Sequence, residues 1–489
     1  MRDLLSNHAR RQLTLLEYLI EHPVATLAQI SDATGYASRT LWQDAKEANS
    51  YLEPIKIEAT QNGLQLVVPQ GCSVRTIYNR LLGQSKEYNL LEYLFLHEGE
   101  TLEELAESLF LSLSTLRRMI VQMNKTLEKS GILISTSPAQ ILGDELSVSQ
   151  FFIALFSEKY YDLSYLLNKE ECYTMNLLFE RIMKDSAIEL NFPDLQKMRI
   201  WGYVRLVRMR YNHPIVYENE KKLWREYPFL QDAAFLAQFY AVFSIRMDEA
   251  LLLQMFQVLF GGQYAASYTQ LQEMVKQNDE QKKLYDKVIV LLNNLAKQLN
   301  ISLQGTERMQ LNIYNMLQLS SYRYFIIYSR SRQFIDGFAR DNKSIVEIFY
   351  TQVSELLGCT RDNYICDDVT FTLITEWPDL IDKIDAMVPE IRIGVLFDSN
   401  MKHAEFVQRT LSKHSRLKVS VAVPRMFSTF SGQIPGKDLD ILVTDIPGIV
   451  APGVEVVCVQ EYPSEKDWQD ILLVQERVFS QKMKGFAFT

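Results

Sequence analysis

The sequence has few of the residues that carry metal or redox chemistry. Its five cysteines are scattered without a CxxC pair, and its six histidines show no HExxH or similar metal-ligand spacing. Cys359 and Cys366 are the nearest pair of cysteines, and no histidine lies near them. Reduced thiols are the default for such a pattern. We therefore expect no catalytic residue, no metal, no cofactor and no enzymatic activity.

Long hydrophobic runs are also missing. No apolar stretch approaches the ~18–20 residues of a membrane span, and the first residues, MRDLLSNHARRQLTLLEYL, are too charged for a signal-peptide core. With 47% hydrophobic and 23% charged residues, the composition is that of a folded protein. At 489 residues the chain is long enough for roughly three or four domains. We expect a cytoplasmic protein without a membrane partner.

A basic overall charge is absent as well. The formal net charge is −9, and residues 1–150 contain 13 Lys and Arg residues against 18 Asp and Glu residues. Nucleic-acid-binding domains usually carry a basic patch or stripe. Any such footprint in this chain must therefore be confined to single helices.

The stretch from Leu111 to Lys129 combines an apolar stripe with a basic face. Leu116, Ile120, Met123 and Leu127 recur at the spacing of one helix face. The other side exposes Ser114, Arg117, Arg118, Gln122 and Lys125. A shorter amphipathic helix precedes this stretch, with Thr101 as N-cap and Glu104 at the capping-box position. Two helices joined by a tight turn, the second one basic, predict a helix-turn-helix whose second helix enters the major groove of DNA.

The same pattern occurs twice at a constant offset. LLEYL stands at 15–19 and again at 90–94, 75 residues later, and the same offset matches Thr26 with Thr101 and Asn49 with Asn124. Internal repeats of this kind outrank local readings of the sequence. In the first copy, the second helix is expected to expose Ser38, Arg39, Trp42, Gln43 and Lys46.

Each copy is followed by two short apolar runs that are typical of a hairpin. The first two runs flank Asn62-Gly63, the strongest short hairpin signal, and the second two flank Ser137-Pro138. An isolated helix pair of this kind is a structural or protein-binding element about as often as it is a DNA-binding one. The duplication and the hairpins instead favour two winged helix-turn-helix modules that bind double-stranded DNA. Because each module offers few cations, we expect modest affinity per module, raised by dimerisation or by several modules.

Residues from about 170 to 385 have an almost wholly helical pattern, which also looks duplicated. At an offset of 111, residues 196–215 align with 307–326, so that Met198 matches Met309 and Tyr211 matches Tyr322. We interpret this region as two similar helical bundles. His213 is its only histidine, and the second copy has Tyr324 at that position.

The last hundred residues alternate between apolar strands and helices. Strands are expected at 391–397, 417–423, 440–445 and 454–459, and a final helix at about 464–484, which predicts a small α/β domain with a parallel sheet. The loop Asp398-Ser399-Asn400 lacks a glycine-rich signature, so a plain connection is favoured over a phosphate site at the helix N-terminus. Cys458 is expected to be a small buried hydrophobe.

With these features on one chain, the sequence resembles the Mga/AtxA-like transcriptional regulators of Gram-positive bacteria. The resemblance covers essentially the full length and is most specific at 11–165, above all in TLAQISDATGYASRTLWQDAKEANSYLE and TLEELAESLFLSLSTLRRMIVQMNKTLE. It implies a global, mostly activating regulator, often of virulence and carbohydrate genes. The implied partners are double-stranded DNA and a second copy of the chain, with RNA polymerase and the phosphocarrier of the phosphotransferase system as further candidates.

The resemblance also implies a domain plan. Winged helix-turn-helix 1 would occupy 1–69, and winged helix-turn-helix 2 with its linking helices 70–168. Phosphotransferase-type regulation domains would occupy 169–278 and 279–387. An enzyme IIB-like α/β domain at 388–489 would help the protein to dimerise.

The chain departs from the family's pattern at two places. Regulation domains of this kind are typically controlled by phosphorylated histidines, but only His213 is available, and it precedes Pro214. The first strand of the last domain is followed by no phosphorylatable cysteine. Two functions therefore stay open: a DNA-binding regulator, or a phosphorylation-switched sensor or phosphotransferase component acting through His213. The structural alternative for His213 is a helix end, where a polar or cationic residue suits the terminal carbonyls.

Overall fold

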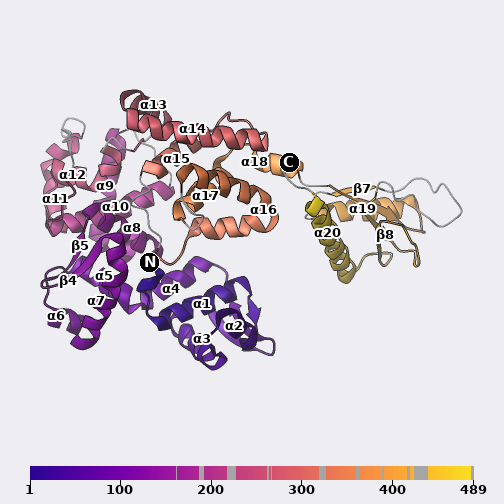
Figure 1. Cartoon of the computed structure of the whole chain (residues 1–489), viewed down its shortest axis with the longest axis horizontal. Coiled ribbons are helices and arrows are strands. Elements are labelled where there is room, and N and C mark those ends of the chain that lie inside the picture. Colours follow the sequence, from indigo (N-terminus) through magenta and orange to yellow (C-terminus); the bar gives the residue numbers. More distant parts are fainter. Residues whose placement is uncertain are drawn as a thin grey trace. The chain divides into compact units, whose positions relative to one another are not determined.

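The chain is mainly helical and ends in a small parallel sheet (Figure 1). The computed structural model describes residues 1–160, 162–186, 192–216, 227–260, 264–265, 267–318, 326–358, 363–387, 390–415, 419–422 and 439–485. These residues form two compact units. The first comprises 1–292, 307–338 and 349–376, and the second comprises 293–306, 339–348 and 377–489. The expected architecture, multidomain and mainly α with two winged modules and a C-terminal parallel sheet, is confirmed.

The first winged module extends from α1 to β3. Its elements are α1 (Asn7–Glu21), β1 (Val24–Ala25), α2 (Leu27–Thr34), α3 (Ser38–Leu52), β2 (Lys56–Thr60) and β3 (Gly63–Val67). Thr26 caps α2 by accepting from the backbone N–H of Gln29, whose side chain accepts from Thr26 in return. Gly35 ends α2 at φ 75°, a left-handed conformation that suits glycine. The hairpin is completed by β1, which pairs with β3.

The second winged module repeats this order. Its elements are α5 (Lys86–Leu96), α6 (Leu102–Ser108), α7 (Leu113–Leu127), β4 (Ile132–Thr136) and β5 (Ala139–Gly143). The predicted capping box is present, because Thr101 accepts from the Glu104 backbone N–H and Glu104 accepts from Thr101. Ser112 caps α7 by accepting from the Thr115 backbone N–H.

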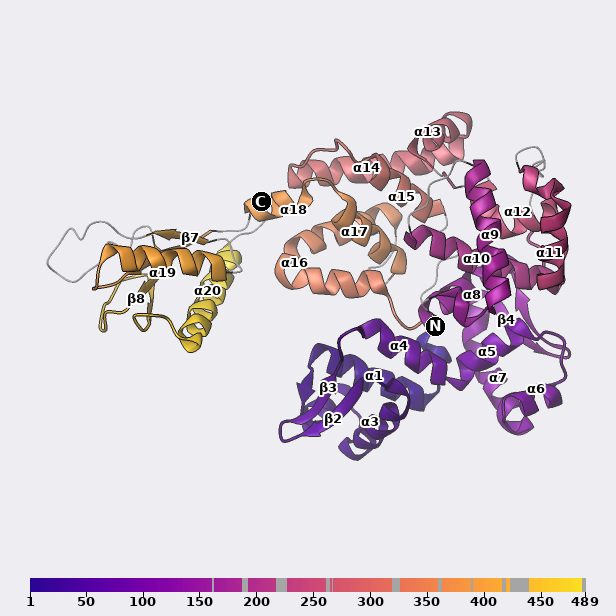
Figure 2. The ribbon, with the colours of Figure 1, turned by 180° about the vertical axis from the view of Figure 1, so that it is seen from behind.

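One linking helix, α4 (Val74–Gln84), lies between the two modules (Figures 1 and 2). It contacts α1 and α3 of the first module and α5 of the second. It also packs on α8 (Glu145–Lys159), the apolar helix that follows the second hairpin. The hydrophobic core is therefore continuous from the first module into the second.

The helical region continues from α9 to α18. The bounds are α9 (Lys169–Ser186), α10 (Phe192–Arg210), α11 (Ala233–Phe243), α12 (Glu249–Phe260), α13 (Tyr268–Gln277), α14 (Asp279–Leu299), α15 (Glu307–Gln318), α16 (Arg330–Leu357), α17 (Tyr364–Glu376) and α18 (Leu380–Met387). Shifted by 111 residues, α9 overlaps α14, α10 overlaps α15 and α12 overlaps α17, in agreement with a duplicated bundle. Tyr324, the counterpart of His213, lies outside the described residues.

The α/β domain has a four-stranded parallel sheet in the order β7-β6-β8-β9. Its elements are β6 (Ile391–Leu396), α19 (Met401–His414), β7 (Val419–Ala422), β8 (Ile441–Thr444), β9 (Glu455–Cys458) and α20 (Glu465–Gly485). Both helices pack on the sheet around buried Ile393, Val395 and Val443.

The expectation that Cys458 is buried is wrong. Its side chain is exposed, whereas its neighbours Val457 and Val459 are buried. Side chains alternate between the two faces of a strand, and β9 is an edge strand, so only one face of it packs on the domain. The loop after β6 ends with Asn400, which caps α19 by accepting from the His403 backbone N–H at 2.9 Å. In the described part of the chain, no helix is both long and apolar enough to cross a membrane.

Candidate nucleic-acid interface

Helix α7 has one wholly buried side and one exposed side. Leu116, Ile120, Met123 and Leu127 are at most 2% exposed and hold the helix on its module. The five residues predicted to face DNA are all exposed: Ser114, Arg117, Arg118, Gln122 and Lys125. Among the described residues, the three cations lack a strong partner within the module, since their one ion pair, Arg117 to Glu103 at 4.0 Å, joins two largely exposed side chains. Such pairs contribute little, so these side chains are available for a polyanion.

Helix α3 has the same inner side but a more occupied outer side. Arg39, Gln43 and Lys46 are exposed, whereas Ser38 and Trp42 are half-buried. The Lys46 ammonium lies 5.1 Å from the centre of the Trp42 ring, a cation–π contact. Gln43 donates to Glu47 at 2.9 Å. The outer side of α3 therefore carries fewer uncommitted polar groups than that of α7.

An acidic and histidine cluster lies beside α3. His8 contacts Glu47 at 2.7 Å and Asp44 at 3.4 Å, which brings three possible metal ligands together. Arg11, however, pairs with both oxygens of Asp44, which is 1% exposed, and the hydrogen bond to Asp44 raises the pKa of Arg11. The Arg11 guanidinium thus already neutralises the buried Asp44 carboxylate, and the cluster holds α1 against α3.

Helices α3 and α7 are each bonded to their hairpin by an asparagine. Asn49 of α3 donates to the Ile57 carbonyl at 2.9 Å and accepts from the Ile57 N–H at 2.7 Å. Asn124 of α7 makes the same two bonds to Ile134, each at 2.9 Å. The match between Asn49 and Asn124 is visible in the sequence, but its role is visible only in the structure. The asparagine fixes the angle between helix and wing in both modules.

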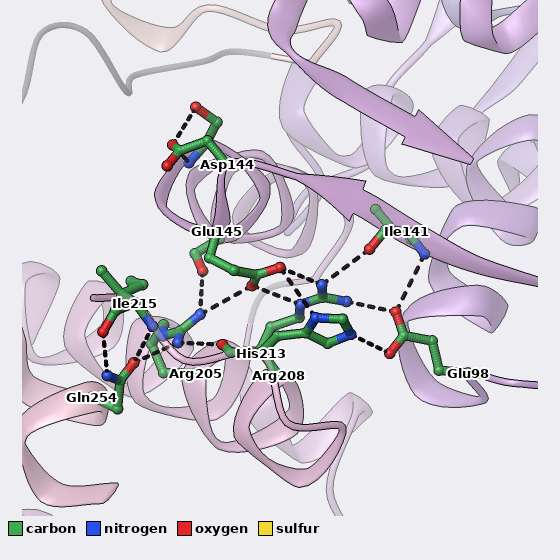
Figure 3. A network of polar contacts seen from close by, with 11 residues as sticks. Glu98, Ile141, Asp144, Glu145, Arg205, Arg208, His213, Ile215 and Gln254 are labelled. Atoms are coloured by element: carbon green, nitrogen blue, oxygen red, sulfur yellow. Dashed lines mark hydrogen bonds and ion pairs between the residues drawn. The ribbon is translucent and has the colours of Figure 1, made fainter. Parts of the chain in front are cut away.

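His213 lies in a buried polar network between the second module and the helical region (Figure 3). It follows the end of α10, and its backbone N–H donates to the Arg208 carbonyl at 3.0 Å. Its ring contacts Glu98 at 2.7 Å and Glu145 at 3.6 Å, which come from the segment after α5 and from the start of α8. His213 therefore both terminates a helix and contacts two carboxylates of the neighbouring module.

Arg208 is the centre of this network. It is 0% exposed and bonds to Glu98 at 2.9 Å, to both oxygens of Glu145 at 2.5 and 3.0 Å, and to the Ile141 carbonyl on β5 at 3.0 Å. Burial alone would raise the pKa of Glu98, but the hydrogen bond from His213 and the charge of Arg208 outweigh it and lower that pKa. Glu98 thus enters the network as an anion that needs its cations.

A second arginine extends the network into the helical region. Arg205, also 0% exposed, bonds to Ser149 at 2.8 Å, to the His213 carbonyl at 2.9 Å and to Gln254 of α12 at 2.6 Å. Sequence reasoning named His213 but missed its carboxylate partners Glu98 and Glu145, because they are separated from it by up to 115 residues. In the sequence, the local signal is the presence of two arginines within the apolar helix α10. That both are buried is seen only in the structure.

The two helix-turn-helix units with outward cations define the class of DNA-binding regulators. Comparison with known proteins agrees, since residues 70–156 match the family model described as the Mga helix-turn-helix domain. A putative trans-acting regulator of Streptococcus pneumoniae is 22% identical over 91% of this chain and 93% of its own length. The capsule synthesis positive regulator AcpB of Bacillus anthracis is 19% identical over 94% of this chain and 97% of its own length. The capsule synthesis positive regulator AcpA of the same species is 28% identical over 31% of this chain and 31% of its own length.

These relatives confirm the resemblance to the Mga/AtxA-like regulators. The relatives are regulators rather than enzymes, and this chain is likewise a transcription regulator and not an enzyme.

Proposed function

We propose that this chain is a transcription activator that binds double-stranded DNA through the outer sides of α3 and α7. The observation that carries the proposal is α7, whose five predicted contact residues are exposed while the opposite stripe is buried. A helix held in this way presents its outer side to a major groove without rearranging the module. The curated relatives that are named positive regulators support the activating sense.

The second module contributes most of the affinity. Arg117 and Arg118 are adjacent on its exposed side, and an arginine bonded to a guanine edge contributes about 1–3 kcal/mol of discrimination. The corresponding residues of the first module, Trp42 and Gln43, carry no charge, and each makes a contact within α3.

A gel-shift titration with the full chain tests this proposal. Arg117→Ala with Arg118→Ala should weaken binding and reduce its dependence on salt, because fewer counterions are released. Lys282→Ala with Lys283→Ala is the matched control, since it removes two exposed charges from α14. The reverse ranking, or an equal loss from Arg39→Ala with Lys46→Ala, would assign the main contacts to the first module.

The remaining parts of the chain have proposed roles in regulation and assembly. The helical segments 169–278 and 279–387 would act as regulation domains, and 388–489 as an enzyme IIB-like domain that holds a dimer or higher oligomer. The active protein would be cytoplasmic and would contact RNA polymerase at its promoters. Weak modules gain affinity when two copies bind together, which supports a dimer.

A phosphorylation switch at His213 is the second candidate function. The observation in its favour is that His213 bridges the second module and the helical region, with Arg205 and Arg208 in the same network. A phosphoryl group from the phosphotransferase-system phosphocarrier would displace Glu98 or Glu145 and recruit an arginine. Opposite effects of His213→Asp and His213→Ala on reporter transcription, with and without a preferred sugar, would support the switch. Equal effects would leave His213 a structural residue.

A further inference from the structure

Helices α3 and α7 share one scaffold. Both contain 15 residues and begin 75 residues apart. Leu41 and Leu116 occupy the same buried position, and Asn49 and Asn124 make the same pair of bonds to their hairpins. The two helices are therefore presented by their modules in the same way, and residue numbers can be compared position by position.

The outer sides of the same helices differ at the positions that would meet bases. Trp42, Gln43 and Lys46 of α3 correspond to Arg117, Arg118 and Val121 of α7. Val121 is 61% exposed, so a branched apolar side chain projects between polar neighbours. The scaffold is retained between the copies, whereas the exposed chemistry is exchanged.

These side chains recognise different base edges. Arginine bonds to O6 and N7 of guanine, and an exposed apolar side chain contacts the C5-methyl group of thymine. Glutamine instead bonds to N6 and N7 of adenine. The α7 set is therefore suited to guanine and thymine. The α3 set instead joins Gln43, which suits adenine, to Lys46 and Arg39, which can bond to guanine, and it has no exposed apolar side chain at the position of Val121.

The hairpin tips do not remove the difference in exposed side chains between the two modules. Their tips are Gln61-Asn62 and Ser137-Pro138, and neither tip carries a charged side chain. Neither hairpin tip therefore supplies an arginine contact of the kind that α7 offers.

We propose that the two modules read different base sequences, so that one protomer recognises a bipartite site with two unlike halves rather than a repeated motif. The thymine contact falls in the half under α7, and the adenine contact falls in the half under α3. This inference rests on the proposed function, since it specifies the DNA that the same two helices bind.

Selection from random double-stranded DNA with the full chain tests the inference. Three proteins are compared: the wild type, Arg117→Ala with Arg118→Ala, and Gln43→Ala with Lys46→Ala. The wild type should enrich two different short motifs at fixed spacing. Each double variant should lose base preference in one motif only, with a loss of about 5- to 150-fold for each base contact removed. Far-ultraviolet circular dichroism checks that each variant folds.

Transferring exposed residues of α7 to the matching positions of α3 provides an independent test. Gln43→Arg with Lys46→Val places α7 chemistry on two exposed positions of α3. It should shift the first motif towards the second. Enrichment of a single motif in two copies by the wild type, loss of both motifs in either double variant, or sequence-independent retention of DNA would overturn the inference. Failure to retain any double-stranded DNA would instead remove the proposed function.

Discussion

Replacing Arg208 by methionine should loosen the second winged module from the helical region. The guanidinium makes four bonds at 2.5–3.0 Å, to Glu98, Glu145 and the Ile141 carbonyl, and it is completely buried. Methionine retains much of the side-chain volume but supplies no donor. Among the described residues, the two carboxylate side chains, 5% and 14% exposed, would keep His213, the Ile141 N–H at 3.2 Å and a 3.5 Å contact from Arg205. Removing one partner of a buried ion pair costs roughly 3–5 kcal/mol.

Hydrogen exchange is the suitable assay, because a chain with several domains does not unfold in one step. Mass spectrometry of peptides covering β4 and β5 reports the local opening free energy of the wing. Arg208→Met should lower it by about 3 kcal/mol, whereas Arg210→Met, at an exposed position of the same helix, should leave it unchanged. A decrease below about 1 kcal/mol, or equal decreases for the two variants, would refute the reasoning.

The same network should respond to acid. The pKa of Glu98 is lowered in the folded chain, so its contribution is complete above the ordinary glutamate range and is lost as the pH falls through the folded value. Exchange protection of the wing should therefore decline on acidification in the wild type. Arg208→Met should reduce this decline, because a cation that stabilises the Glu98 anion is gone.

Four further predictions concern other sites. Burial raises the pKa of Glu158 to about 7 despite three backbone N–H donors, so stability should fall as the pH rises from about 4.5 to 7, and Glu158→Gln should flatten that part of a thermal-shift profile. Leu116→Ala should cost about 2–5 kcal/mol, and a normal melting temperature would show that its burial is irrelevant. Phe110 has a φ of 54° and is 96% exposed. Its replacement by glycine should raise the free energy of unfolding by roughly 1 kcal/mol, measured by denaturant unfolding. Truncation after residue 387 should lower both the sedimenting mass and DNA affinity, and unchanged values would exclude the last domain as dimeriser.

The repeated modules could be predicted because their signals are local. A buried helix face repeats every three or four residues, and Thr101 with Glu104 places a helix start within one turn. The first hairpin is set by turn chemistry within four residues, although its tip is Gln61-Asn62, one residue before the predicted Asn62-Gly63. Each of these features could be read without knowing which distant segment would pack against it.

The polar network could not be predicted from the same kind of signal. His213 and Glu98 meet across 115 residues, and no spacing in the chain pairs them. The prediction that Cys458 is buried was wrong for a related reason. VEVVCV is apolar at consecutive positions, so the sequence does not show which face of the strand is buried. Trp42 is half-buried because it packs against the hydrophobic core, which helix periodicity does not reveal either.

The wing is the element through which His213 and α7 are connected. Asn124 of α7 bonds to Ile134 on β4, and Ile134 pairs with Ile141 on β5. The Ile141 carbonyl accepts from Arg208, and its N–H donates to Glu98, which contacts His213. The first module has the Asn49 bonds but no buried arginine on its hairpin among the contacts of the described residues. A chain of hydrogen bonds therefore connects His213 through β5 and β4 to α7, the helix with the denser cations, and α3 has no equivalent connection among the contacts of the described residues.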